Sequence, residues 1–121
     1  MSVITEGAHT GGFMVSEANG RRSRDAITVA AGESLGAGAV LGRITSTGEY
    51  AAVNPEASDG SETAVAVLYA AVDASAAVAP GVAVARSAEV NGAELVWPEG
   101  ITPAQQAAAV ADLASVGIIT R

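Results

Sequence analysis

The sequence predicts a mainly β domain with a single helix near its C-terminus. Valine and isoleucine supply 21 of the 32 apolar residues larger than alanine, and β-branched side chains fit a strand better than a helix. Short apolar segments alternate with turn residues, a pattern typical of an all-β domain. One alanine-rich segment after residue 102 carries helix start and stop signals. A chain of 121 residues fits one domain.

Residues 1–24 are expected to form a flexible N-terminal arm ahead of a β-rich domain over 25–121. The arm is rich in glycine and polar residues, and its apolar side chains show no sustained period. Ordering a residue costs about 1–2 kcal/mol of backbone entropy, which so few apolar side chains do not offset. We expect its two apolar groups to order against a partner. These groups contain Val3, Ile4, Phe13, Met14 and Val15.

Strands are expected from Asp25 onward. The segment DAITVAAG predicts a strand that ends at Gly32. Two more strands are predicted at about 39–45 and 49–54, joined by a tight turn at STGE. This part of the chain therefore predicts a strand followed by a hairpin.

The second half of the β-rich region begins with a polar loop. The segment NPEASDGSE is rich in turn residues. Residues 63–75 are apolar on both faces and predict one buried strand. In the segment that follows, Val82 and Val84 fall on one face of a further strand, and Ala83 and Ala85 fall on the other.

A helix is expected over about 103–116. Thr102 and Gln105 have the spacing of a capping box, and Pro103 suits the first helical position. Gly117 supplies a stop signal, after which the segment IIT is expected to return as a short strand. One helix face is predicted to hold the core residues Ala107, Val110, Leu113 and Ala114.

The apolar residues are unusually small. Of the 60 apolar residues, 28 are alanine, and burial stabilises in proportion to area, at about 25 cal/mol per Å². The core is therefore expected to be thin for the chain length, and small domains already bury a low fraction of their surface. Self-association would add apolar burial, although composition alone leaves a modest monomer equally open.

Composition also argues against several classes of partner. Thirteen acids oppose six arginines, there is no lysine, and the net charge is −7. Such a chain repels phosphate backbones, which argues against nucleic-acid binding. The longest apolar run has nine residues, too few to cross a membrane, and no targeting signal is visible at the start. We therefore expect a protein made in the cytoplasm, with no membrane partner.

No catalytic, cofactor or metal site is expected. The single His9 lies in the arm without a second group to hold it as a base. Cysteine is absent, so thiolate metal sites are excluded. Glu56, Asp59 and Glu62 lack the spacing of a calcium loop and are expected to form a solvated loop. We expect no small-molecule substrate.

Two further segments have simple structural interpretations. The glycine run GAGAVLG at 36–42 is followed by a strand and a turn, whereas a dinucleotide-binding loop needs a helix there. It is interpreted as a β-bend. The basic cluster RRSRD at 21–25 is interpreted as part of a solvated arm, although contact with phosphate or an acidic protein surface stays open.

The order of features resembles the lambda-type head decoration proteins of tailed bacteriophages. The resemblance rests on residues 38–75, with their run of strand, turn, strand, acidic loop and apolar strand. It also rests on AEVNGAELVWPEGIT at 88–102, where Leu95, Trp97 and Pro98 match a Leu-x-Trp-Pro pattern, and on the closing helix with GIITR. Together these pieces cover about 25–121.

The resemblance implies a small β-clip-like domain, an incomplete barrel, that assembles as a homotrimer. It implies that trimers bind the outside of the expanded capsid at three-fold and quasi-three-fold positions. There they clamp the major capsid protein against the pressure of packaged DNA, and no reaction is catalysed. The alternative is a trimeric β-rich binding module or a tail or fibre accessory module.

The resemblance also suggests roles for particular residues. The arm residues Val3, Ile4, Phe13, Met14 and Val15 are expected to contact the capsid by strand addition. Leu95, Trp97 and Pro98 are expected to anchor either the trimer or the core. For Trp97, an ordinary core position is as well supported by the sequence as a contact between subunits.

Overall fold

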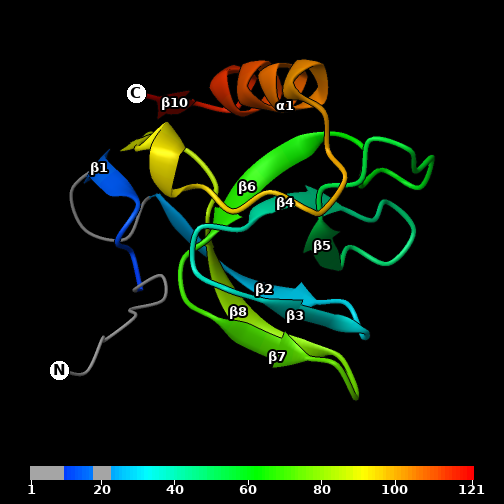
Figure 1. Cartoon of the computed structure of the whole chain (residues 1–121). Helices are drawn as coiled ribbons and strands as arrows, with labels where there is room; N and C mark the ends of the chain where they lie inside the picture. The colour runs from blue at the N-terminus through cyan, green and yellow to red at the C-terminus, as the bar shows by residue number, and fades with distance from the viewer. Residues whose placement is uncertain (1–9, 18–22) are drawn as a thin grey trace, which may run out of the picture.

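The computed structural model describes residues 10–17 and 23–121 and shows a small barrel with a helix packed against the outside of β6 (Figure 1). Ten strands, one 3-10 helix and one α-helix occur in these residues. The bounds are β1 Met14–Glu17, β2 Arg24–Val29, β3 Glu33–Leu35, β4 Val40–Arg43, β5 Tyr50–Ala52, β6 Ala64–Leu68, β7 Val72–Ala74, β8 Ala79–Val84, β9 Ala88–Val90, η1 Gly92–Glu94, α1 Pro103–Ser115 and β10 Ile118–Thr120. The predicted mainly β class with one C-terminal helix is confirmed.

The central element is a closed barrel with the strand order β2-β5-β4-β6-β8. Most neighbours pair antiparallel, but β2 and β5 are parallel and share a single register pair, Val29 with Tyr50. The amide of Ala30 also donates to the carbonyl of Tyr50 at 2.8 Å. The barrel therefore closes, where the sequence led us to expect an incomplete one, but it closes through a short seam.

Strands β4 and β6 are buried on both faces. Val40 and Val67 point into one apolar cluster, whereas Leu41 and Leu68 point into another. The first cluster lies between the barrel, α1 and the β1-β9-β10 sheet, and the second fills the barrel. The two strands form a wall between two cores, which explains why their sequences show no polar alternation.

Two glycines, one just before β4 and one within it, allow the backbone to pass close to its neighbours. Gly38 has φ +92°, and a Cβ there would lie 2.8 Å from the carbonyl oxygen of Glu94. A Cβ on Gly42 would lie 2.3 Å from the carbonyl oxygen of Ser61, beside the register shift between β4 and β6. The interpretation of the glycine run as a β-bend agrees with this geometry, because the run turns at 37–38 and then enters β4, and no helix begins there.

The C-terminal helix α1 begins as the sequence predicts. Thr102 is the N-cap, Gln105 completes a capping box, and Pro103 is the first helical residue. The buried positions of α1 are Ala109 and Leu113. Ala107 and Ala114, which were expected in the core, are exposed. That part of the prediction was wrong because alanine is abundant all round the helix and does not mark the apolar face.

Several strand bounds also differ from expectation. Residues 63–75 do not form one strand, because the chain bends after Leu68 and then starts β7. Strand β6 stays in the barrel, whereas β7 pairs antiparallel with β3, a short strand at 33–35 that the sequence did not predict. Residues 81–92 likewise divide between β8 and β9. Apolar runs alone do not reveal where a strand changes partners.

Residues 10–17 belong to the folded body. The predicted flexible arm over 1–24 was therefore wrong for these residues. Strand β1 pairs antiparallel with β9, and β9 pairs in parallel with β10. Phe13 is only 2% exposed and packs in the cluster beneath α1. The amide of Asn91 donates to the carbonyl of Phe13 at 2.7 Å. A segment too poor in apolar residues to fold alone is held by one aromatic side chain and a strand partner.

The core is as thin as the composition predicts. In the described part of the chain, 23 apolar residues are buried, and ten of these are alanines. Each large side chain therefore contributes a substantial share of the buried area.

Replacing Phe13 tests whether this segment stabilises the fold. Phe13→Ala removes a buried aromatic ring and should lower the free energy of unfolding by about 3–5 kcal/mol, measured by urea denaturation. Val15→Ala is the matched control, because Val15 is two residues away and 54% exposed. The control should change the free energy by no more than about 0.5 kcal/mol. Equal effects of the two substitutions would show that residues 10–17 do not contribute to the core.

Candidate functional site

The β1-β9-β10 sheet presents an exposed edge near the start of the described chain. Strand β1 lies at the edge of the sheet and has β9 as its neighbour. The register shifts between Met14 and Ser16, which leaves Val15 as a bulged residue with 54% exposure. Ile119 on β10 is 39% exposed. This sheet therefore combines an edge strand with exposed β-branched side chains, two features of surfaces that bind extended segments.

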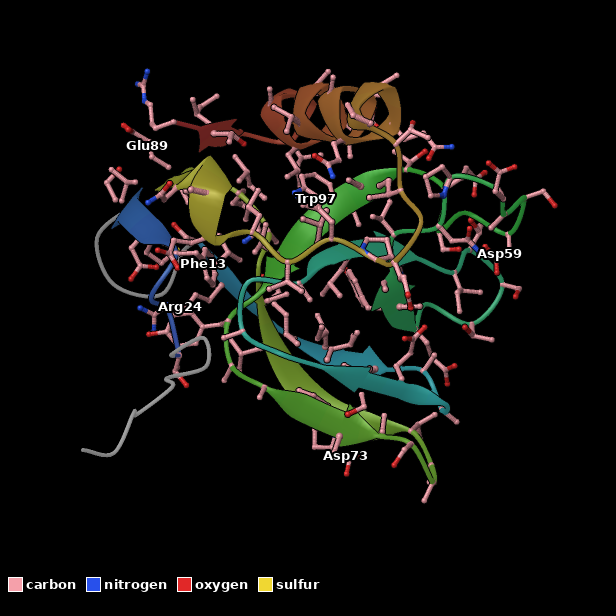
Figure 2. The ribbon with its side chains drawn as sticks, in the orientation of Figure 1. Phe13, Arg24, Asp59, Asp73, Glu89 and Trp97 are labelled. Atoms are coloured by element: carbon pink, nitrogen blue, oxygen red, sulfur yellow. The ribbon has the colours of Figure 1, made fainter. Side chains whose placement is uncertain are left out.

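An ion pair crosses the outer face of this sheet. Arg121 Nε donates to Glu89 Oε2 at 2.9 Å, which joins the end of the chain to β9 (Figure 2). This hydrogen bond and the arginine charge lower the pKa of Glu89 below its ordinary value. The pair keeps the charge on this face balanced.

A second group of contacts fixes the root of β1. Arg24 Nε donates to Glu17 Oε2 at 3.0 Å, and a second nitrogen of the same guanidinium contacts the other carboxylate oxygen. The guanidinium carbon also lies 4.1 Å from the ring centre of Tyr69. Bidentate pairing and a cation–π contact hold the end of β1 next to the start of β2.

The Leu-x-Trp-Pro segment lies against the core of its own subunit. Val96 donates from its amide to the carbonyl of Gly38 at 2.8 Å, which fixes the segment beside the start of β4. Leu95 is buried, and Trp97 is partly buried against the same cluster that contains Phe13. Pro98 is partly exposed and lines a surface hollow of about 350 Å³. Leu95 and Trp97 therefore contact the core directly. Their contact with another subunit stays a prediction.

Two further acids lie away from this sheet, Asp59 on the loop between β5 and β6 and Asp73 on β7. Asp59 and Asp73 each accept hydrogen bonds from the amide and hydroxyl of a serine two residues later. These bonds lower the pKa of both carboxyls and keep them charged. In Figure 2, Asp59 lies on the opposite side of the molecule from Glu89 and Arg24.

Potential metal-ligating side chains do not cluster in the described residues. Over 10–17 and 23–121, no group of three histidines, cysteines or acids is arranged to hold a metal ion. His9, Val3 and Ile4 lie outside the described residues. In the same two ranges, no helix is long and apolar enough to cross a membrane.

The geometry alone does not identify the protein family, but comparison with known proteins does. The sequence model for the family described as "Bacteriophage lambda head decoration protein D" matches residues 3–118, nearly the whole chain. The chain belongs to this family of phage head decoration proteins. No curated protein sequence matches the chain.

Membership in the decoration family indicates what the protein does. The protein is a structural component of the phage capsid, and it associates with the capsid in the virion. The family match confirms the resemblance found in the sequence.

Sequence reasoning missed the structural role of Phe13. The signal available was its rarity, because it is the only phenylalanine in a chain with 3% aromatic residues. In such a chain, a large aromatic side chain is one of the few ways to fill a core, even when its neighbours are glycines and polar residues.

The ion pair between Glu89 and Arg121 predicts a pH dependence of stability. Because the pKa of Glu89 is lowered in the folded state, its contribution is complete above the unfolded pKa of about 4.3 and is lost as the pH falls through the folded value. Glu89→Gln should therefore flatten part of the fall in urea midpoint between pH 6 and pH 3. Glu94→Gln, at an exposed position on the neighbouring η1, is the control. Parallel curves for wild type and Glu89→Gln would contradict the role of the pair.

Proposed function

We propose that the protein is a homotrimer that binds the outer surface of the expanded capsid at three-fold and quasi-three-fold positions. There it contacts the major capsid protein and stabilises the head against the pressure of packaged DNA. The observation that carries the proposal is the decoration-family match over residues 3–118. The protein is made in the host cytoplasm and acts in the virion.

The segment before Thr10 is proposed to supply capsid contacts through Val3 and Ile4. It leads into a fixed point, because Gly11 donates its amide to the carbonyl of Tyr69 at 2.8 Å and Phe13 is buried two residues later. Strand addition gives affinity through main-chain hydrogen bonds. Three such segments on one trimer would strengthen a weak contact through effective concentration.

The folded body is proposed to add contacts through the β1-β9-β10 sheet. Val15 is exposed at the edge strand, and Met14 is half-buried behind it. Phe13 is not available for such a contact, because its ring fills the core. Of the arm residues expected to contact the capsid, Met14 and Val15 remain candidates, whereas Phe13 stabilises the fold.

The charge distribution supports an outward position on the shell. The chain carries a net charge of −7, and an acidic protein gains nothing from contact with packaged DNA. The tail or fibre module considered from sequence has no observation in its favour, whereas the family match names a head protein.

Co-sedimentation with expanded shells that lack decoration tests the proposal. Full-length protein should pellet saturably with the shells, and a variant lacking residues 2–9 should pellet more weakly. The deletion ends before Thr10 because a longer one would remove Phe13 and β1 and unfold the body. The control is the same deletion variant without shells, whose urea midpoint should match that of the full chain.

The outcomes separate the parts of the proposal. If the deletion variant pellets as well as the full chain, the capsid contacts lie on the folded body and the role of Val3 and Ile4 is wrong. If neither protein pellets at any shell concentration, the decoration role itself is wrong.

Trp97→Ala tests the anchor role of the Leu-x-Trp-Pro segment. Because Trp97 packs against the core cluster, the substitution should lower the melting temperature, as measured by calorimetry. If the exposed part of the ring also joins subunits, the oligomer mass measured by light scattering should fall at the same time. Unchanged mass and unchanged melting temperature together would remove both roles.

A further inference from the structure

The outer face of the β2-β8 pair carries few polar residues for a surface strand pair, namely Thr28 and, at one end, Arg24. Ala26 lies opposite Val82, and Thr28 lies opposite Pro80, and all four residues are exposed. An antiparallel pair with one face in water normally alternates apolar residues inside and polar residues outside. Here the inside is apolar, with Ile27 and Val29 buried, and the outside is nearly apolar as well.

The turn between β7 and β8 extends this surface. Ala76 and Ala77 are exposed, and Val78 is 51% exposed, among the highest values for a large apolar residue in the described chain. The turn projects beyond the barrel at the bottom of Figure 1. We refer to Ala26, Thr28, Pro80, Val82 and the turn 76–78 as the β2-β8 face.

A hollow of about 350 Å³ lies at the other end of the β2-β8 face. It is lined by Arg24, Asp25, Ala26, Tyr69 and Val82. Its charged groups are already paired within the subunit. Arg24 binds Glu17, and Arg86 binds Asp25. Covering the hollow therefore buries balanced charges, which costs less than burying free ones.

We propose that the β2-β8 face is where two copies of this chain pack against each other. The proposal rests on the homotrimer of the proposed function and assigns the surface that builds it. Copies that each carry a charge of −7 repel one another, so they approach most easily through a face with no free charge. None of the residues that define the β2-β8 face is charged. On its rim, Asp25 is paired with Arg86, and Asp73, beside the turn, accepts hydrogen bonds from the amide and hydroxyl of Ser75.

The shape of this face also suits a ring of three copies. A closed ring with three-fold symmetry needs two different patches that meet, unlike a two-fold dimer, in which one patch meets itself. The β2-β8 face offers a projecting turn around Val78 and a hollow beside Val82. The turn of one copy packs into the hollow of the next, and the thin core of each subunit gains apolar burial between subunits.

Thiol accessibility tests this assignment in the intact protein. The chain has no cysteine, so Val82→Cys introduces one thiol on the β2-β8 face, and Ala107→Cys introduces a control thiol on the exposed side of α1. In the assembled protein, a bulky maleimide should modify Cys at position 82 at least about tenfold more slowly than in protein diluted until light scattering reports single copies. The rate at position 107 should not change on dilution.

Charged variants give a second, independent measurement. Val82→Glu places an unpaired charge in the proposed contact and should weaken association about 100-fold, whereas Ala107→Glu should leave it unchanged. Circular dichroism checks that both variants stay folded, and if Val82→Glu unfolds, the cysteine pair alone decides. A trimer that binds shells while Cys at position 82 reacts freely overturns this inference and leaves the proposed function intact. A wild-type protein that stays a single copy and does not pellet overturns both.

One remaining outcome identifies a different occupant. If position 82 stays protected in single copies and becomes reactive when residues 2–9 are deleted, the face is covered by the chain's own N-terminal segment. That result overturns the assignment to a second copy.

Discussion

The pairing of β4 with β6 is the constraint on which the rest of the structure depends. These two strands separate the barrel interior from the cluster beneath α1, and each supplies side chains to both. The two clusters on either side of them hold the rest of the fold together. Strands β2, β5 and β8 complete the barrel, whereas α1, Leu95, Trp97 and Phe13 close the opposite side. A wall of this kind requires apolar residues at consecutive positions, and it leaves no place for a charge or an unpaired polar group.

Alanine determines how closely the elements approach this wall. Small residues let backbones come near one another, as at Gly38, where a Cβ would lie 2.8 Å from the carbonyl oxygen of Glu94, but they bury little area. The fold therefore depends on a few large side chains that pack where secondary-structure elements meet. Phe13 joins β1 to the cluster, Leu113 joins the helix, and Ile118 joins the last strand. Several β-branched residues remain exposed, and contact with a neighbouring molecule would bury their apolar area.

Much of this fold is predictable from local signals. The capping box at Thr102 and the stop at Gly117 predicted α1 almost to the residue, because helix ends are set by chemistry within a few positions. The division of residues 63–75 between two sheets was not predictable, because strand pairing depends on segments far away in the chain. Phe13 was missed for the same reason, since its stabilising contacts come from β9 and α1. The Leu-x-Trp-Pro segment was recognised by its pattern, but its packing against the core of its own subunit required the structure.

The position of Phe13 has a mechanical consequence for a protein tethered through its N-terminus. Tension on the residues before Thr10 passes first to a turn bonded to Tyr69 and then along the axis of β1. Because β1 is held to β9 side by side, its hydrogen bonds share such a pull and do not open one at a time. The aromatic ring must also leave the core before the strand slides. In the proposed attachment through the segment before Thr10, this short strand and its buried ring would bear the load before the barrel does.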